Sequence, residues 1–193
     1  SGGFLSAVEA ALKGGVRALQ LREKDLALDA LLDLSRAVKL LTRKYGASLV
    51  VNGSAEIAEA VGAEGVHLPE NQSATVEQVR KKYPGLLVGV SVHTLASARS
   101  AESMGADYIT FSPIFDTPSK RQYGFPQGLG KLREVTRSVG IPVLALGGIT
   151  VERIPDVMNA GAFGVALMSG IWNSKDIEKT AFEYIRYFGG KSI

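Results

Sequence analysis

The sequence AESMGADYITF, residues 101–111, gives the clearest indication of the fold. It has the pattern of an Ala-rich helix end, a turn at Gly105 and a short apolar strand. Glycine is common directly after a helix because it tolerates the left-handed backbone conformation. The same order recurs in AALKGGVRALQL (10–21), AEAVGAEGVHL (58–68) and VMNAGAFGVAL (157–167). Repetition of helix, short turn and buried strand is typical of α/β proteins with a parallel sheet.

The hydrophobic pattern predicts seven strands with helices between them. The expected strands are 18–22, 49–52, 65–68, 87–92, 108–112, 143–147 and 164–169. The expected helices are 4–13, 26–45, 55–61, 75–82, 95–104, 129–138 and 151–159. The first expected element is therefore a helix with no strand before it.

This alternation favours a (β/α)₈ TIM barrel as the fold class, with the first strand missing from this numbering. A doubly wound open sheet is the alternative. Such a sheet would carry a dinucleotide-type glycine fingerprint or a reversal of strand order, and the sequence indicates neither. The length of 193 residues suits one domain that covers residues 1–193.

Composition excludes several classes of protein. Hydrophobic residues make up 46% and charged residues 21%, and no apolar run reaches membrane-spanning length. The absence of cysteine excludes disulfides, thiolate metal sites and a cysteine nucleophile, and we expect a cytoplasmic protein. The net charge is +3, but lysine and arginine are scattered among acidic residues. This pattern favours a small anionic ligand over nucleic acid as the binding partner.

Polar residues gather at the carboxyl ends of the expected strands, where the active site of a barrel forms. They are Gln20, Arg22, Lys24, Asn52, His67, Glu70, Asn71, Ser91, His93, Ser112, Gly147, Gly148, Met168 and Ser169. With two histidines and no H-E-x-x-H spacing, a zinc site is disfavoured. No G-x-S-x-G motif is present, which disfavours a serine hydrolase.

The segment RALQLREKD, residues 17–25, places Gln20, Arg22 and Lys24 two residues apart. In a strand these side chains share one face, and burying them without partners would be costly. We interpret Arg22 and Lys24 as ligands of an anion, since arginine offers a fork and lysine a point charge to phosphate oxygens. Gln20 can recognise a neutral ring through one donor and one acceptor.

A second anion site is expected at the last two strands. Gly147-Gly148 in ALGGIT and Ser169-Gly170 in LMSG allow an anion to approach backbone N–H groups closely. Thr117, Ser119 and Lys120 in SPIFDTPSKRQYG are further donors. Two anion sites at one end of a barrel suggest that two phosphorylated substrates are joined.

At these residues the chain resembles the thiamine phosphate synthase/TenI family. The matching segments are QLREK, VVNGSAEIAEAVGAEGVHL, GVSVHTLASARSAESMGADYITFSPIFDTPSK, YGFPQGLGKLREV, IPVLALGGIT and GAFGVALMSGI. They cover most of the chain in the family's order. The resemblance implies a (β/α)₈ barrel and a transferase of thiamine biosynthesis. That enzyme joins hydroxymethylpyrimidine diphosphate to thiazole phosphate and releases pyrophosphate.

The resemblance also implies roles for individual residues. Gln20 and Asn52 would contact the pyrimidine, and Ser91 would lie by the departing pyrophosphate. The residues implied for the diphosphate are Arg22, Lys24 and Lys120. The residues implied for the thiazole phosphate are Thr117, Ser119, Gly147, Gly148 and Ser169. Met168, at the same strand end as Ser169, is a further candidate for substrate binding. Pyrophosphate would leave first, so the protein must neutralise the leaving group and position the thiazole.

Three positions depart from the family's patterns. The two aspartates that hold Mg²⁺ in the synthases are replaced by Gly53 and Gln72. Mg²⁺ prefers carboxylate and phosphate oxygens, and Glu70 and Asp116 are the nearest alternatives. The catalytic histidine of TenI-type thiazole tautomerases is replaced by Pro113. The alternatives to a synthase are therefore a tautomerase or a non-catalytic phosphate-ligand binder, and a homo-oligomer is compatible with each.

Overall fold

The computed structural model describes residues 2–23, 25–117 and 125–189. Three predicted site residues, Lys24, Ser119 and Lys120, lie outside the described residues. Internal contacts divide the chain into two compact units. Unit 1 comprises residues 1–67 and 171–193, and unit 2 comprises residues 68–170.

Unit 1 is built on parallel strands that pair in chain order. Strand β1 (Ala18–Leu21) pairs with β2 (Ser48–Asn52), and β2 pairs with β3 (Gly65–Leu68), whose first three residues belong to this unit. The helices of the unit are α1 (Gly2–Lys13), α2 (Leu28–Lys44), α3 (Ala55–Ala60) and α9 (Ile177–Phe188). On α2, Leu31, Ser35, Val38 and Thr42 are buried, the spacing of one helical face.

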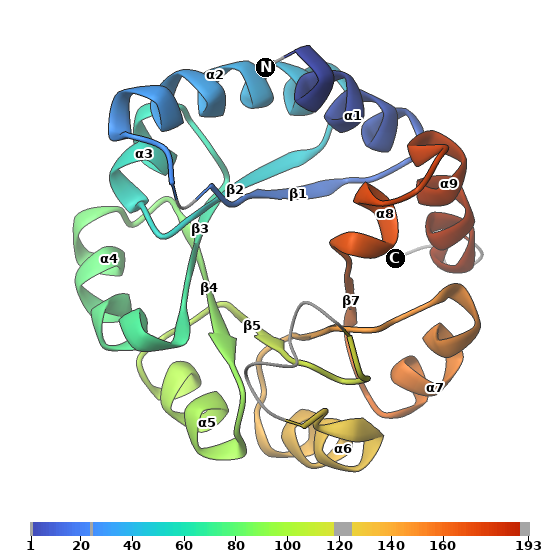
Figure 1. Cartoon of the computed structure of the whole chain (residues 1–193). Helices are drawn as coiled ribbons and strands as arrows, with labels where there is room; N and C mark the ends of the chain where they lie inside the picture. The colour runs from blue at the N-terminus through green and yellow to red at the C-terminus, as the bar shows by residue number, and fades with distance from the viewer. Residues whose placement is uncertain (1, 24, 118–124, 190–193) are drawn as a thin grey trace. The chain divides into compact units, whose positions relative to one another are not determined.

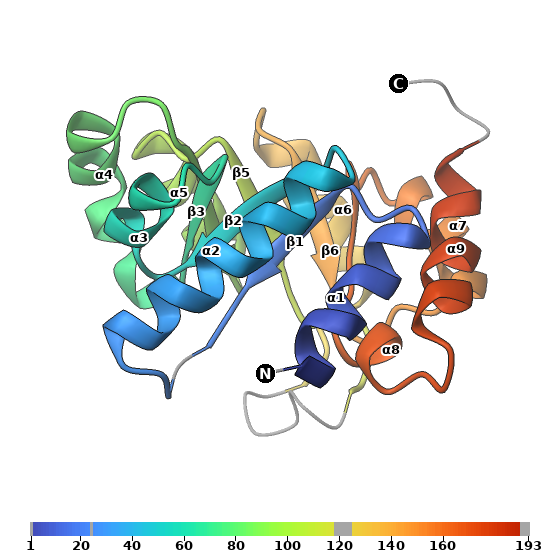
Figure 2. The same ribbon diagram turned by 90° about the horizontal axis from the view of Figure 1, so that it is seen from above.

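Helices α1 and α9 lie side by side (Figures 1 and 2). The chain approaches α9 closely just after α1, at Gly14. A Cβ atom added at Gly14 would lie 2.7 Å from Ala181 Cβ and would also collide with the carbonyl of Glu178. Glycine is therefore the residue that lets the end of α1 meet the first turns of α9.

Unit 2 continues the same pattern with four strands. Strands β4 (Leu87–Val92), β5 (Tyr108–Phe111), β6 (Val143–Leu146) and β7 (Gly164–Ala166) pair in parallel and in chain order. The helical elements are η1 (Glu70–Thr75), α4 (Val76–Lys82), α5 (Leu95–Ser103), α6 (Gly128–Ser138), η3 (Val151–Arg153) and α7 (Ile154–Asn159). Helix α8 (Ser169–Trp172) begins here and ends in unit 1.

The core of unit 2 follows from strand alternation. In β4 the side chains of Val88, Val90 and Val92 are fully buried, while Ser91 on the other face is half-buried. Helices α5, α6 and α7 lie on one side of the strands (Figure 1). Because these strands are parallel, their carboxyl ends lie at one edge of unit 2, together with the predicted site residues of this unit.

Seven strands are present in the described part of the chain, as the sequence predicts. The last strand ends at Ala166 because helix α8 begins at Ser169. The predicted helix 151–159 is divided between Arg153, where η3 ends, and Ile154, where α7 begins. The short elements η1 and α8 and the terminal helix α9 were not predicted. No helix in the described ranges is both long and apolar enough to cross a bilayer.

Candidate functional site

At the strand ends of unit 1, three polar residues lie at one level. Leu21 pairs with Val51 and Asn52 pairs with His67, so Arg22, Asn52 and His67 follow one another across the three strands. Neighbouring residues of a parallel sheet point to the same face. Asn52 Nδ2 donates a hydrogen bond of 3.1 Å to the His67 carbonyl, which also accepts from Gly53 N at 2.9 Å. The Asn52 side chain is thus fixed by β3.

His67 is buried and lies next to a cation. Burial lowers its pKa to about 4, and the nearby Arg22 guanidinium contributes in the same direction. His67 is consequently neutral at neutral pH. The positive charge on this part of unit 1 comes from Arg22.

Gln20 and Arg22 are exposed, although Leu21 between them is buried. The sequence suggested that burying these polar side chains would cost free energy. Because both side chains are exposed, that cost does not arise. Among the described residues, neither side chain has a hydrogen bond or an ion pair. In the described part of the chain no carboxylate neutralises the Arg22 guanidinium at this strand end, which suits an anionic ligand.

In unit 2, His93 follows β4 and is held from two sides. Its backbone N–H donates to Glu70 Oε1 at 3.2 Å, and its Nδ1 lies 2.7 Å from the Ser112 carbonyl. A carbonyl only accepts, so Nδ1 carries the proton and Nε2 is the acceptor of the neutral ring. The sequence did not single out this orientation, because it depends on the β4–β5 register.

Ser91 lies one residue before the end of β4 and pairs in register with Thr110 on β5. Thr110 Oγ1 donates to Ser91 Oγ across 3.4 Å. The Ser91 hydroxyl is thereby placed on the half-buried face of the strand, beneath the loops at its carboxyl end.

Gly147 and Gly148 form a tight turn after β6, with positive φ angles of 105° and 63°. The Gly147 carbonyl accepts a 3.0 Å hydrogen bond from Phe115 N. Added Cβ atoms would lie 2.8 Å from Pro113 Cβ at Gly147 and 2.8 Å from Phe115 Cβ at Gly148. Only glycine permits both this backbone conformation and this close approach of the loop after β5.

The remaining thiazole-phosphate candidates in unit 2 lie near this turn. Leu146 pairs with Ala166, so Met168 and Ser169 follow β7 at the same edge as Gly147. Thr117 is buried, and it follows Asp116, whose carbonyl is in contact range of Gly148. The structure therefore brings Thr117, Gly148 and Ser169 to one edge of unit 2.

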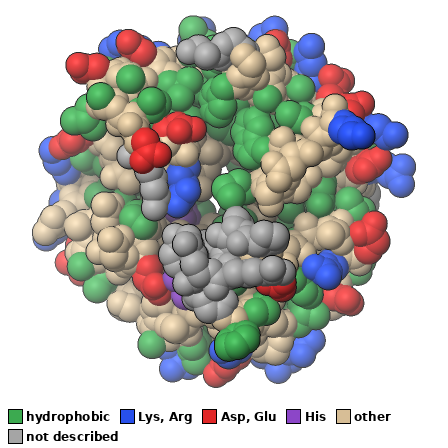
Figure 3. Space-filling view, viewed as in Figure 1, with side chains coloured by type: hydrophobic (Ala, Val, Ile, Leu, Met, Phe, Trp, Pro, Cys, Tyr) green, Lys and Arg blue, Asp and Glu red, His purple; other side chains and the backbone are tan. Residues whose placement is uncertain are grey.

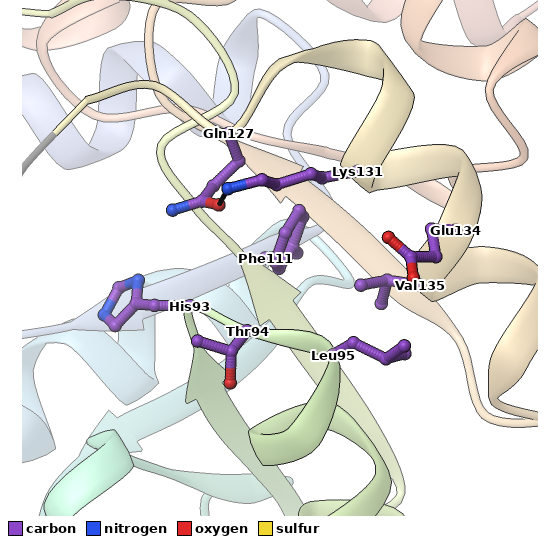
Figure 4. Close-up of a pocket in the computed structure, with 8 residues that line it drawn as sticks. All are labelled: His93, Thr94, Leu95, Phe111, Gln127, Lys131, Glu134 and Val135. Carbon is purple, nitrogen blue, oxygen red and sulfur yellow. Dashed lines mark hydrogen bonds between the residues drawn. The ribbon is translucent and has the colours of Figure 1, made fainter.

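A pocket of about 220 Å³ lies beside this edge, between the start of α5 and helix α6. Its lining residues are His93, Thr94, Leu95, Phe111, Gln127, Lys131, Glu134 and Val135 (Figure 4). Lys131 Nζ donates to Gln127 Oε1 at 3.1 Å. His93 lies at the opposite end of the pocket from Glu134, so the imidazole belongs to the strand-end edge rather than to the helix side (Figure 4).

Charges are interspersed on the molecular face in Figure 3, where acidic and basic side chains alternate. Among the described residues this face carries no basic stripe of the kind that follows a nucleic-acid backbone. The cations of interest are local ones, such as Arg22.

The described residues do not fit the family's Mg²⁺ site. Gly53 has no side chain, Gln72 offers an amide, and the Glu70 carboxylate accepts the His93 N–H. Within ranges 2–23, 25–117 and 125–189, no group of three or more histidine, cysteine or acidic side chains could hold a metal ion. Neither of these two positions supplies the carboxylate that Mg²⁺ prefers.

Comparisons with known proteins identify the family of the chain. Residues 1–171 match the family model described as thiamine monophosphate synthase. A protein of Geobacter sulfurreducens, named provisionally as a thiamine-phosphate synthase, is 47% identical over 92% of this chain and 84% of its own length. The thiamine-phosphate synthase of Roseiflexus castenholzii is 41% identical over 91% of this chain and 77% of its own length.

A solved structure shows the same fold. It is the thiamine phosphate pyrophosphorylase of Pyrococcus furiosus, which superposes with a TM-score of 0.88 at 32% identity. The superposition covers 96% of this chain and 89% of that chain. The similarity confirms the predicted fold class, an α/β fold of the TIM-barrel type, and the family that the sequence motifs indicated.

Proposed function

Because the chain belongs to the thiamine monophosphate synthase family, we propose that it is a transferase of thiamine biosynthesis. It joins hydroxymethylpyrimidine diphosphate to thiazole phosphate and releases pyrophosphate. The observation that supports this proposal most is the environment of Arg22. Its exposed guanidinium has no carboxylate partner among the described residues and follows β1 at the level of Asn52, next to a neutral histidine.

The proposed chemistry needs charge neutralisation and positioning rather than a protein nucleophile. As the diphosphate departs, Arg22 stabilises the growing negative charge through paired N–H donors. On the family resemblance alone, Lys24, Lys120 and Ser91 are further candidates for binding the diphosphate. Gln20 and Asn52 are proposed to orient the pyrimidine through amide donors and acceptors.

The thiazole phosphate is assigned to unit 2. Backbone N–H groups of the Gly147-Gly148 turn are suited to a phosphate, because glycine allows the anion to approach the main chain closely. Ser169 and Thr117 are proposed to add hydroxyl donors, and Ser119 is proposed on the family resemblance alone. Met168, which is exposed, is proposed to border the thiazole.

Mg²⁺ has no step in this proposal. The family resemblance leads us to expect the ion, but Gly53 and Gln72 supply no carboxylate for it. The charge of the leaving group is therefore assigned to side-chain cations. Any Mg²⁺ that takes part would be held mainly by the substrate's own phosphate oxygens.

A thiazole tautomerase is the second candidate, and His93 is the observation that favours it. The position of the tautomerase histidine is occupied by Pro113, which directly follows Ser112. The His93 ring contacts the Ser112 carbonyl through Nδ1, leaving Nε2 as the acceptor that a general base requires. Isomerisation of thiazole carboxylate phosphate by the parent, abolished in His93→Gln, would support this reading.

The synthase proposal is tested with Arg22→Gln and a matched control, Arg17→Gln. Both variants remove one exposed guanidinium near an end of β1, but Arg17 precedes the strand and, among the described residues, donates only to the neighbouring Val16 carbonyl. We expect Arg22→Gln to lower kcat/KM for the pyrimidine diphosphate about 100-fold, as for a lost charged contact to the leaving group. Arg17→Gln should match the parent. Equal turnover of the two variants would contradict the proposal.

A further inference from the structure

The side chain of Arg153, in η3, contacts both the glycine turn and the loop that packs on it. Its Nη1 donates a 2.6 Å hydrogen bond to the Gly148 carbonyl. Its guanidinium carbon lies 4.5 Å from the centroid of the Phe115 ring. Phe115 N in turn donates to the Gly147 carbonyl at 3.0 Å. Both carbonyls of the turn are therefore held by neighbouring residues of unit 2.

These contacts fix the direction of the N–H groups. In a trans peptide the N–H points opposite to the carbonyl of the same peptide. The Gly147 carbonyl faces Phe115, so the Gly148 N–H points away from the loop after β5. The Gly148 carbonyl faces Arg153, so the N–H of the next residue points away from the guanidinium. In the described part of the chain, Gly148 N donates to no acceptor.

The turn needs such support because of its sequence. Two consecutive glycines with positive φ have many accessible conformations, and ordering them costs more entropy than ordering other residues. A charged donor on one carbonyl and a cation stacked on an aromatic ring are among the stronger surface contacts. Arg153 forms no ion pair with a carboxylate in the described ranges, so these two contacts are what its head group makes.

We propose that Arg153 is a positioning residue for the anion-binding turn. It holds the Gly148 carbonyl and stacks on Phe115, whose N–H holds the Gly147 carbonyl, and so it keeps the Gly148 N–H directed at the phosphate of the thiazole substrate. Through Phe115 it also fixes the loop that leads to Thr117. This inference rests on the proposed function, because it assumes that the turn binds a phosphate. Arg153 acts through the backbone and does not itself touch the substrate.

The test uses inorganic phosphate as the probe and the backbone amide of Gly148 as the reporter. The full chain, labelled with ¹⁵N, is titrated with phosphate, and the Gly148 amide shift gives an apparent Kd. Arg153→Met keeps the aliphatic part of the side chain and removes the guanidinium. Arg153→Lys keeps the positive charge but lacks the paired N–H donors of the guanidinium. Arg133→Met on α6 is the control, since it removes one exposed guanidinium from the same unit.

We expect Arg153→Met to raise the apparent Kd about tenfold, Arg153→Lys to give a smaller increase, and Arg133→Met to match the parent. The ratio between Arg153→Met and the parent should persist at higher ionic strength, since positioning is not screened by salt. An unchanged Kd in Arg153→Met would overturn the inference. Full rescue by Arg153→Lys, or a ratio that disappears in salt, would also overturn it by showing an effect of charge alone.

The same titration separates this inference from the proposed function. If the Gly148 amide of the parent does not respond to phosphate, the phosphate site itself is wrong and the positioning role falls with it. If the parent responds and Arg153→Met responds equally, the site stands and only the positioning role is removed. Retained dispersion of the other amide signals shows that each variant is folded.

Discussion

His67 makes the stability of the chain depend on pH in a defined direction. Its folded pKa, about 4, lies below the ordinary value of 6.5, so the unfolded chain binds the proton first as pH falls. Stability from this residue is fully present above pH 6.5 and is lost progressively between pH 6.5 and 4. By pH 5, above the range in which most carboxylates titrate, the loss should reach about 2 kcal/mol.

Urea unfolding at pH 7 and pH 5 checks this prediction in the parent, His67→Gln and His93→Gln. These are the two histidines of the chain. The loss between the two pH values should disappear in His67→Gln and remain in His93→Gln. The same loss in the parent and in His67→Gln would show that His67 titrates normally in the folded protein.

Gly53 offers a matched test of the missing metal ligand. Its φ is +78° and no atom lies within 4 Å of an added Cβ, so the position has room for a side chain. Aspartate and asparagine tolerate this left-handed conformation better than most residues. The double variant Gly53→Asp, Gln72→Asp can therefore be compared with Gly53→Asn, Gln72→Asn, which has nearly the same shape and no added carboxylate.

We expect the aspartate pair to raise Mg²⁺-dependent synthase turnover above that of the parent and of the asparagine pair. The gain should exceed that of either single aspartate, because one carboxylate leaves the ion mostly solvated. Turnover is measured at fixed Mg²⁺ for all variants. If the parent already turns over as fast as the aspartate pair, another carboxylate holds the metal ion. Glu70 would then be the first residue to replace. An aspartate pair that binds Mg²⁺ and stays inactive would favour the binding-only alternative.

At the scale of elements, the packing of α1 against α9 depends on Gly14. Gly14→Ala would push a methyl group against Ala181 and the Glu178 carbonyl, which should destabilise the protein by about 2 kcal/mol. Gly3→Ala in α1 is the control, since an added Cβ there meets nothing within 4 Å and alanine favours helix. Thermal unfolding should place Gly3→Ala at or above the parent and Gly14→Ala clearly below it. Similar melting temperatures for the two variants would mean that α9 moves without cost.

The helices and strands that the sequence predicted are those with strong hydrophobic periodicity. Strands β3 and β4 have the predicted bounds, since each is a clear apolar run between turn residues. The last strand was predicted three residues too long because LMSG continues the apolar pattern while Ser169 already begins a helix. Helix α9 was missed, although Asp176 accepts from Lys179 N as an N-terminal cap, because no strand follows it.

At the scale of the whole molecule, some parts of the candidate site could be predicted from residue type, whereas others depend on the register between distant segments. The motifs alone placed Arg22, Asn52, Gly147 and Gly148 at strand ends, because parallel strands end at one edge. The orientation of His93 and the contacts of Arg153 depend on pairings between distant segments, which one sequence does not indicate. Arg153 had no local signal, since an arginine in a short helical turn is ordinarily a solvated surface residue.

The family and the fold are shared with synthases, whereas Gly53 and Gln72 carry no carboxylate. Activity is therefore the decisive property of the whole chain. Its most direct measurement is the formation of thiamine phosphate from hydroxymethylpyrimidine diphosphate and thiazole phosphate, with Mg²⁺ and with a chelator. We predict stoichiometric thiamine phosphate and pyrophosphate at an enzyme-like rate, with catalysis retained when Mg²⁺ is removed. Binding of both substrates without any product, with and without Mg²⁺, would contradict the account.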